Sequence, residues 1–600
     1  MKHFFFTTFF RHKTIAFLIY LFFFLILFLQ LPLRKEISGN CDTWLALSYS
    51  SYSLESIKSF LTGTEPGSPM HPVHNPLAYG ESAPGIQLPI IIMKYLGLSD
   101  YWVNYLYISA IFSLTAFAIF VFAGNFTVFF PAKMLAGFIF TVNNISFAHI
   151  DDSIIIFFFF PVLALHFLFR WFHEKNIKFL VLSSVLAGIQ IYFSFYVFFY
   201  QFVMIFIFSA VSVFKNRVKL TELIKPAALY LLISAAIFVP HLLFYLETMQ
   251  ELEFVEIFDK FYTVKMASIN PLDFILVLPD NLIYPDLGKM TGIPMNWGFV
   301  RHYNFTGLIA LALFIYSFFK WNSFRLFLGM TALAGLFLAA GPVFMFNMKE
   351  VFYSPLYVFY KLIPALGFLR VAVRAHFIFL FAMSIGAALS TEKLFKGKKY
   401  QNFFISAMFL LHFFESTPLP IKGFDASVTD KVPMIYNYIK KMDGRPLIIE
   451  LPSRMDVEFL NWDDSIFNDP AEFIFKGTDR LSLKVENISM FVNSWDDIFQ
   501  YNREIIYTNW QTSHKIDSVN GVNGYFPVPR MMYQYHINRL PDKKSFQTLK
   551  KWGVNYIVWH ESMKIEGDTL SLEILNNSEC LTRINTAEES SLFKLEECNE

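Results

Sequence analysis

The sequence predicts a polytopic α-helical membrane protein with a water-soluble α/β or α+β domain after the last membrane span. Three observations support this fold class. Hydrophobic residues make up 55% of the 600 positions, whereas soluble domains average about 45 to 50%. Runs of about 20 apolar residues, long enough to cross a bilayer, recur along the first 420 positions. Charged residues number only 50 in those positions but 47 in the last 180.

The apolar runs define about eleven predicted membrane spans in a membrane domain of residues 1–420. The first span is either a cleaved signal peptide or an anchor; its long apolar run, with no small-residue cleavage site after it, favours the anchor. Two shorter apolar segments, Ile86–Leu98 and Leu356–Leu366, suit re-entrant pieces. The predicted spans are 14–33, 102–122, 127–146, 153–171, 177–192, 194–214, 226–246, 304–320, 324–342, 372–391 and 402–418.

Lysine and arginine residues beside the spans predict the orientation of the chain. With the N-terminus in the cytoplasm, sixteen cations fall in short inner connections that contain only three acids, as the positive-inside rule requires. The long loops 34–101, 246–303 and 343–371 then face outward, and an odd number of spans places the C-terminal residues outside as well. We therefore expect a multi-pass protein of the cytoplasmic (inner) membrane with its functional site on the outer face.

The tail, residues 421–600, is expected to form an extracytoplasmic domain. Pro446–Leu451 and Val554–Trp559 are short runs of β-branched and aromatic residues, typical of buried strands. Val432–Met442 has helical spacing, and Asn520–Pro529 is rich in the Gly, Asn and Pro residues of loops. Strands and helices in one soluble segment indicate an α/β or α+β domain.

Three cysteines, Cys41, Cys580 and Cys598, are too few for a disulfide scaffold and lack CxxC spacing. In an oxidising compartment outside the membrane, Cys580 and Cys598 would be able to pair. Two unpaired thiols are the equal alternative.

Acidic residues mark two predicted outer boundaries. Asp42 follows the first span and precedes a predicted amphipathic helix, Trp44–Leu61. Two roles fit this position: a base that accepts a proton from a substrate hydroxyl, or a cap of the helix. His149, Asp151 and Asp152 lie between the third and fourth spans. Three alternative roles fit these residues: binding a divalent cation, positioning an acceptor, or capping the fourth helix. The three aspartates are candidate catalytic residues, and the histidine is a candidate for substrate binding.

Cationic side chains lie close to the outer headgroup level. They are Arg301, His302, Arg370, Arg374 and His376. The arginine side chain forms bidentate hydrogen bonds to a phosphate. Arg374 lies inside an apolar run, where a charge needs a partner; a lipid phosphate, ordinary headgroups and an acid on a neighbouring helix are the alternatives. Arg301, His302, Arg370 and Arg374 are therefore candidates for substrate binding.

Several function classes lack support in the sequence. No basic stripe indicates a nucleic-acid partner. The motifs of phosphate-binding loops, dinucleotide-binding folds, zinc proteases and serine hydrolases are absent. Hydrolysis of nucleotides and serine-type hydrolysis are thus not indicated.

Five stretches, spread over most of the chain, carry a family resemblance. They are SGNCDTW, PLYVFYKLIPALGFLRVAVRAHF, PLIIELP, YTNWQTSHKIDSVNGVNGYFPVP and LKKWGVNYIVWHES. Together with the order of spans and loops, they resemble the GT-C class of integral membrane glycosyltransferases. Within that class the chain looks most like bacterial YfhO-like membrane proteins.

The resemblance implies roles for the candidate residues. Members of the GT-C class use polyprenyl-phosphate sugars as donors. Asp42 would take the place of the first-loop acid that acts as a base or orients the acceptor, and Asp151 and Asp152 that of the second-loop acids. Arg370 and Arg374 would contact the lipid phosphate. Class members often carry an acid pair in the first loop, whereas Thr43 follows Asp42 here, so no cofactor is assigned and a divalent cation stays an option.

The predicted function is therefore transfer of a sugar from a polyprenyl-phosphate donor to an envelope glycan, lipid or protein acceptor. The transfer is expected to take place on the outer face of the cytoplasmic membrane, where membrane lipids are further partners of the protein. A transporter or flippase of a lipid-linked glycan is one alternative, but such proteins usually carry ionisable residues near the bilayer midplane and show internal repeats. A non-catalytic assembly protein is another. Failure of Asp42, Asp151 and Arg370 to converge on one cavity would favour it.

Overall fold

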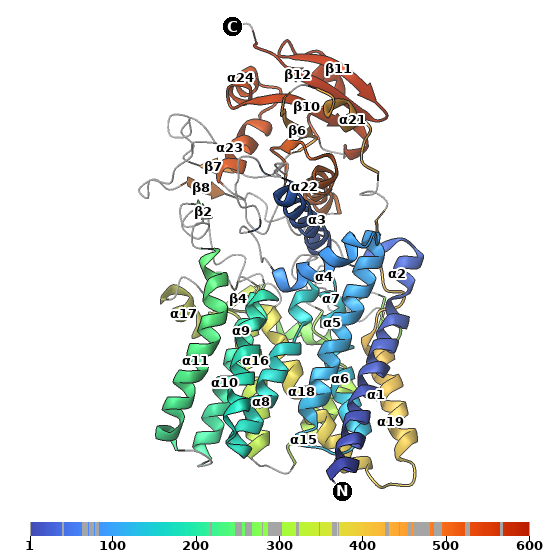
Figure 1. The fold of residues 1–600 in the computed structure, drawn as a ribbon, viewed down its shortest axis with the longest axis vertical. Helices are drawn as coiled ribbons and strands as arrows, with labels where there is room; N and C mark the ends of the chain where they lie inside the picture. The colour runs from blue at the N-terminus through green and yellow to red at the C-terminus, as the bar shows by residue number, and fades with distance from the viewer. Residues whose placement is uncertain are drawn as a thin grey trace.

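In the computed structural model, a bundle of helices carries a region with a β-sheet at one end, and the two termini lie at opposite ends of the molecule (Figure 1). The structure describes residues 2–38, 41–62, 70, 77, 83–215, 219–245, 255–257, 267–278, 280–285, 303–319, 323–346, 349–362, 369, 371–426, 431–442, 444–453, 458–460, 481–484, 495–521, 528–564 and 568–598.

Within these described residues, six helical segments are long and apolar enough to cross a membrane. They contain α1 (Lys2–Phe28) with α2 (Gln30–Leu33), α5 (Asp100–Ala123), η2 (Ser153–Ile156) with α8 (Phe159–Glu174), α10 (Phe195–Phe214), α11 (Leu220–Leu243), and η6 (Ala372–Ala375) with α18 (His376–Phe395). The chain is therefore a multi-pass membrane protein.

The other five predicted spans fall on shorter helices. These are α6 (Phe130–Thr141), α9 (Ile177–Ile189), α15 (Leu308–Ser317), α16 (Ser323–Ala339) and α19 (Gln401–Ser416). Because none has the roughly 20 residues that a full crossing needs, the count of eleven spans stays a prediction.

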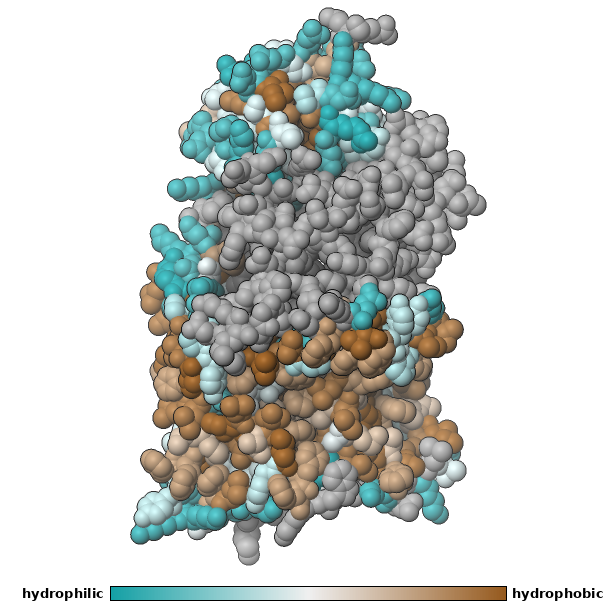
Figure 2. Space-filling model, turned by 180° about the vertical axis from the view of Figure 1, so that it is seen from behind, coloured by the Kyte–Doolittle hydropathy of each residue, from teal (hydrophilic) through white to brown (hydrophobic). Residues whose placement is uncertain are grey.

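Burial separates the centre of the bundle from its lipid-facing side. Of the most apolar stretch in the segment that contains α18, 89% of the residues are buried, against 11% for α11. On the face seen in Figure 2, a broad hydrophobic band crosses the bundle, with hydrophilic residues at the end where the N-terminus lies. This pattern places α18 among its neighbours and α11 against lipid.

The other end of the bundle carries the shorter elements that connect the long helices. They are α3 (Cys41–Thr62), α4 (Pro84–Tyr95), α7 (Asn144–Ala148), η3 (Gln190–Tyr192), η4 (Pro271–Ile275), strands β3 (Val343–Phe346) and β4 (Lys349–Tyr353), and α17 (Leu356–Leu362). A three-stranded sheet in the order β2-β8-β7 pairs Val255–Ile257, Leu481–Lys484 and Glu458–Leu460. The end that carries α3, α4 and α7 faces the tail (Figure 1).

The tail contains a five-stranded sheet, called here the tail sheet, in the order β11-β12-β10-β6-β9. Strand β6 (Leu447–Leu451) pairs in parallel with β10 (Val554–His560) and β9 (Asp517–Ser518), and β12 (Ser590–Leu595) is antiparallel to β10 and to β11 (Leu581–Ala587). Its helices are α21 (Ile435–Ile439), α22 (Trp495–His514), α23 (Val528–Ile537), α24 (Lys543–Lys551), η8 (Glu561–Met563) and α25 (Leu572–Asn576).

The two predicted strands of the tail are confirmed as β6 and β10. The predicted helix Val432–Met442 is shorter, as α21. The predicted loop Asn520–Pro529 ends earlier, because α23 begins at Val528, and its residues 522–527 lie outside the described part of the chain. The domain boundary between residues 420 and 421 stays a prediction.

Two strands tie the start of the first loop to the start of the tail. Strand β1 (Glu36–Ser38) pairs antiparallel with β5 (Gly423–Asp425), and the Arg34 guanidinium donates to the carbonyl of Ile421. Paired strands cannot be separated by a bilayer, so both segments lie on the same side of the membrane. An even number of crossings therefore separates them, which agrees with the odd total expected from the sequence.

The first loop also touches the tail farther along the chain. Glu55 of α3 pairs with Lys515, which follows α22, at 2.6 Å, and the backbone N–H of Met70 donates to the carbonyl of Asn520 at 3.0 Å. Figure 1 shows α3 beside α22. The tail thus packs on the helix that contains Asp42.

Cys580 and Cys598 form a disulfide that joins the start of β11 to the end of the chain. The Cys580→Ser/Cys598→Ser variant lacks this disulfide. Its tail sheet is expected to have a free energy of unfolding lower by about 3 kcal/mol, because the disulfide no longer restricts the unfolded chain between two residues that are 18 positions apart. Urea titration of the full-length protein in detergent, followed by tryptophan fluorescence, measures the change. An unchanged midpoint would contradict this expectation, and Cys41→Ser is the matched control.

Candidate active site

The second-loop acids occupy a buried turn between α7 and η2. Asn143 accepts the backbone N–H of Ser146 at 2.9 Å and so caps α7. After this short helix the chain turns, and the Asp151 carboxylate accepts the backbone N–H of Asp152 at 2.8 Å. Asp151 and Asp152 are 7% and 5% exposed. Because the turn is not helical, the two neighbouring carboxylates have different surroundings.

Asp152, which is buried, forms an ion pair with Arg374, whose side chain is 15% exposed. Arg374 lies in η6, directly before α18, and its neighbour Val373 is held by a backbone hydrogen bond to Ala267 at 2.8 Å. The guanidinium carbon lies 4.6 Å from the centre of the Tyr196 ring, at the start of α10. Of the three partners considered from the sequence, the structure thus provides an acid from a neighbouring element.

A hydrogen-bonded contact brings the beginning of α3 to the same turn. The Thr43 hydroxyl lies 2.6 Å from the carbonyl oxygen of Ser38 and 3.1 Å from that of Asp151. Ser38 is itself anchored, because its N–H donates to the Asn104 side chain at 2.8 Å. The first turn of α3 and the turn of the second-loop acids are therefore direct neighbours.

Asp42 lies within the first turn of α3. The helix begins at Cys41 rather than at Trp44, so the expectation of Asp42 as a residue preceding the helix is wrong. The Thr43 hydroxyl holds this first turn through its contacts with the carbonyls of Ser38 and Asp151, which the local sequence does not show. The Asp42 side chain lies outside the described part of the structure.

The remaining candidates divide into two groups. Arg301, His302 and Arg370 lie outside the described residues, so their placement stays a prediction. His149 is 2% exposed, and its ring lies 6.1 Å from that of Phe377. This histidine is thus close to α18 and to the turn that holds Asp151.

Sequence reasoning missed three polar residues beside the ion pair. Ser153 donates to the Tyr107 hydroxyl at 3.1 Å, and Tyr196 supplies the ring beneath Arg374. A tyrosine inside a phenylalanine-rich helix indicates a polar contact, since its buried hydroxyl needs a hydrogen-bond partner. With 29 tyrosines in the chain, that signal does not single out these two.

The described residues do not form a divalent-cation site. Among them, no three His, Cys, Asp or Glu side chains are grouped as metal ligands. Asp151 accepts a backbone N–H, and Asp152 faces a guanidinium. A divalent cation bound to Asp152 would compete there with Arg374.

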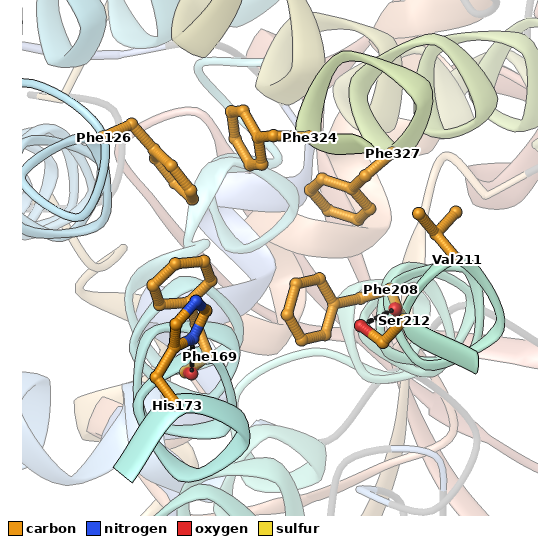
Figure 3. Close-up of a pocket in the computed structure, with 8 residues that line it drawn as sticks. All are labelled: Phe126, Phe169, His173, Phe208, Val211, Ser212, Phe324 and Phe327. Atoms are coloured by element: carbon orange, nitrogen blue, oxygen red, sulfur yellow. Dashed lines mark hydrogen bonds between the residues drawn. The ribbon is translucent and has the colours of Figure 1, made fainter. Parts of the chain in front are cut away.

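An apolar pocket of about 130 Å³ lies between α8, α10 and α16 (Figure 3). Phenylalanine rings line most of it, and its two polar side chains, His173 and Ser212, each bond to a backbone carbonyl of their own helix, at 2.9 and 2.8 Å. His173 lies near the end of α8, whereas Asp152 precedes that helix. A helix of this length separates the pocket from the ion pair by roughly 20 Å or more.

A second buried polar group lies within the tail sheet. Glu450, in the central part of β6, is fully buried. It accepts hydrogen bonds from the hydroxyls of Tyr436 and, at 3.1 Å, Ser518, and His514 lies 3.7 Å away. Burial, together with the nearby charge of Glu504, raises the pKa of Glu450 to about 8.

The comparisons with known proteins concern the fold. No protein-family model matches the chain, and no curated protein matches its sequence. Among solved structures, the arabinofuranosyltransferase AftD from Mycobacteria, determined by cryo-electron microscopy, is similar with a TM-score of 0.51 and 12% identity. The chain has a GT-C-like fold. The match covers 98% of this chain and 40% of AftD, so the chain spans about two fifths of that protein.

A second solved structure is the archaeal oligosaccharyltransferase AglB from Archaeoglobus fulgidus, in complex with an inhibitory peptide and a dolichol-phosphate. Its TM-score is 0.40 at 11% identity, over 91% of this chain and 69% of AglB. The GT-C-like fold supports the class expected from the sequence, while the closer likeness to YfhO-like proteins stays a prediction.

Proposed function

We propose that the chain transfers a sugar from a polyprenyl-phosphate donor to an acceptor of the cell envelope, on the outer face of the cytoplasmic membrane. One observation carries this proposal: the Asp152 and Arg374 pair, buried where the GT-C-like bundle faces the tail and next to the first turn of α3. A cation held at this position suits a lipid phosphate presented at the membrane surface.

Arg374 would stabilise the phosphate of the donor. As the bond between the anomeric carbon and the phosphate oxygen breaks, that oxygen keeps the bonding electrons and negative charge develops on the phosphate. A preorganised guanidinium lowers the energy of this charge without having to reorient during the reaction. The Asp152 carboxylate and the Tyr196 ring fix the guanidinium from two directions, so both are positioning residues. Arg370 is proposed to contact the same phosphate.

Asp42 would act as the base toward the acceptor. Its carboxylate takes the proton of an acceptor hydroxyl while the hydroxyl oxygen attacks the anomeric carbon and polyprenyl phosphate leaves from the opposite face. A single displacement of this kind inverts the anomeric configuration. The contact between Thr43 and the carbonyl of Asp151 brings the backbone of the first turn of α3, which carries Asp42, next to the turn of the second-loop acids. Asp151 and His149 are proposed to orient the acceptor, with Arg301 and His302 as further contacts.

The geometry favours an enzyme over a transporter. The described ionisable candidates lie at the end of the bundle, where α7, η2 and η6 meet, rather than half-way along the long helices. Transport sites usually lie near the bilayer midplane. The contact between the start of α3 and Asp151 supports a shared site, while the convergence of Asp42, Asp151 and Arg370 on one cavity, which separates catalysis from assembly, stays a prediction.

Asp42→Asn is expected to reduce transfer by about 10²- to 10⁴-fold, since the amide cannot accept the proton. Membranes containing either variant receive radiolabelled lipid-linked sugar, and label is counted in lipid, polymer and protein fractions. Asp100→Asn, the same change at an acid that pairs with Lys94, is the matched control. Undiminished transfer by Asp42→Asn would overturn the assignment of the base.

A further inference from the structure

The β3–β4 hairpin and α17 together present a set of exposed apolar side chains, called here the hairpin surface. Its members are each at least half exposed. They include Phe346, Val351, Phe352, Tyr353, Phe359 and Leu362. Large exposed patches of this kind on a protein mark a surface that contacts another apolar phase.

The hairpin surface has a fixed base. Val343 and Met345 of β3 are buried, and the Ser354 hydroxyl donates to the carbonyl of Gly341 at 2.6 Å, which ties the end of β4 to the chain after α16. The Tyr360 hydroxyl donates to the carbonyl of Leu369 at 3.0 Å. The exposed side chains are therefore displayed by elements that are anchored to the bundle.

The connection to α16 restricts where the hairpin lies. Helix α16 ends at Ala339 and β3 begins at Val343, and four residue steps reach at most about 14 Å. The polar interface on each side of a bilayer core is about 5 to 8 Å thick. A hairpin this close to the end of a predicted span stays within or near that interface. Figure 1 shows α17 at the edge of the bundle and β4 farther in, both at the tail-facing end.

The composition suits the bilayer interface. The charged residues of these three elements are Lys349 and Glu350, at the start of β4, and Lys361, near the end of α17. No charge falls between them. The Lys361 ammonium lies 4.8 Å from the centre of the Tyr357 ring, so its stem runs along an aromatic side chain. Aromatic rings and lysines with this arrangement are typical of membrane–water interfaces.

We propose that the hairpin surface inserts into the outer leaflet of the membrane and anchors the segment before Arg374 to the lipid. The occupant is the bilayer itself, because β3 begins four residues after the end of α16, a predicted span, which keeps the hairpin within or near the headgroup layer. Insertion leaves the backbone of the hairpin at headgroup depth, where its edge groups reach water or headgroups, and buries the side chains among the first acyl carbons. This anchoring does not depend on the reaction that the protein catalyses.

Depth-dependent fluorescence quenching tests the proposal in the full chain. A single cysteine at position 352, by Phe352→Cys in a Cys41→Ala background, is labelled with the environment-sensitive dye NBD; Cys580 and Cys598 are held in their disulfide. The protein is reconstituted in vesicles of phosphatidylcholine and phosphatidylglycerol. Separate vesicle preparations contain lipids with a nitroxide quencher at the headgroup, at about carbon 5 or at about carbon 12 of the acyl chain. We expect blue-shifted emission and strongest quenching by the shallow acyl quencher.

Matched positions calibrate the measurement. Lys551→Cys, on an exposed part of α24, is expected to give no quenching, and Leu232→Cys, 68% exposed on α11, is expected to be quenched within the membrane. Leu362→Cys on α17 repeats the test should the change at 352 disturb the ring contact between Phe344 and Phe352. Absence of quenching at 352 and 362 would overturn the proposal: red-shifted emission like that at 551 would show a surface in water, and blue-shifted but unquenched emission would show a surface covered by protein. Since transfer activity is not the readout, failure here and failure of the proposed function are distinguishable.

Discussion

Replacing Arg374 by alanine is expected to lower sugar transfer by about 10²- to 10³-fold, the usual effect of removing one preorganised donor from a site where charge develops. The same change leaves Asp152 buried without its cation, and an unpaired buried charge destabilises the fold. Activity and folding must therefore be measured together, as kcat, KM for the donor, and the melting temperature of the purified protein.

A double variant separates the two effects. In Asp152→Asn/Arg374→Ala the unpaired carboxylate is gone, so the melting temperature is expected to recover toward that of the wild type while transfer stays low. Arg374→Lys keeps the charge but not the planar fork, and should retain part of the activity. Wild-type transfer by the stable double variant would contradict a role for Arg374 at the phosphate.

The contribution of Glu450 to the stability of the tail sheet is expected to fall as the pH rises from about 5 to about 9. The folded-state pKa of Glu450 is about 8, above the ordinary value of 4.5, so the folded chain holds a proton that the unfolded chain releases. This stabilisation is complete below the ordinary pKa and is lost as the pH rises through the folded pKa. Each tenfold difference in proton affinity corresponds to about 1.4 kcal/mol, so the loss amounts to several kcal/mol.

Two histidines act in the opposite direction at low pH. Burial lowers the pKa of His560 to about 3 and that of His514 well below its ordinary value. Their contribution to stability is present above about 6.5 and is lost as the pH falls through the range below it. Greatest stability is therefore expected near pH 6 to 7, between the two effects.

Glu450→Gln tests the origin of the alkaline loss. The amide keeps a similar shape but cannot ionise, so the variant should hold its stability between pH 7 and about 9 while the wild type loses it. Hydrogen exchange of the β6 amides in the full-length protein, corrected for intrinsic rates, gives the free energy of opening at each pH. Equal slopes for the two proteins would show that Glu450 is not the titrating group, and Glu561→Gln in the exposed η8 is the control.

The elements that were predicted well are those whose own sequence determines them. Long apolar runs gave α5, α10 and α18 nearly in full, and dense β-branched and aromatic residues gave β6 and β10. Shorter or amphipathic elements depend on their partners. Strand β11 has no regular alternation of buried and exposed residues and is defined by its pairing with β12, which no local pattern shows.

The candidate site was predictable in its parts but not in its pairing. The sequence shows that Arg374 needs a partner inside an apolar run, but Asp152 is 222 positions away, and nothing local links them. The carboxylate of Glu450 was an overlooked signal: an acid between Ile449 and Leu451 in a buried strand must find hydrogen-bond donors. Tyr436 and Ser518 supply them.

The pairing of β1 with β5 also bears on biosynthesis. Residues 36–38 leave the ribosome long before residues 423–425, so β1 has no sheet partner while the intervening helices are inserted. The two strands meet only if every crossing between them has been completed with the correct orientation. Closure of this small sheet thus distinguishes a correctly inserted chain from one with a skipped or inverted helix, whose open strand edge would remain accessible to proteases of membrane quality control.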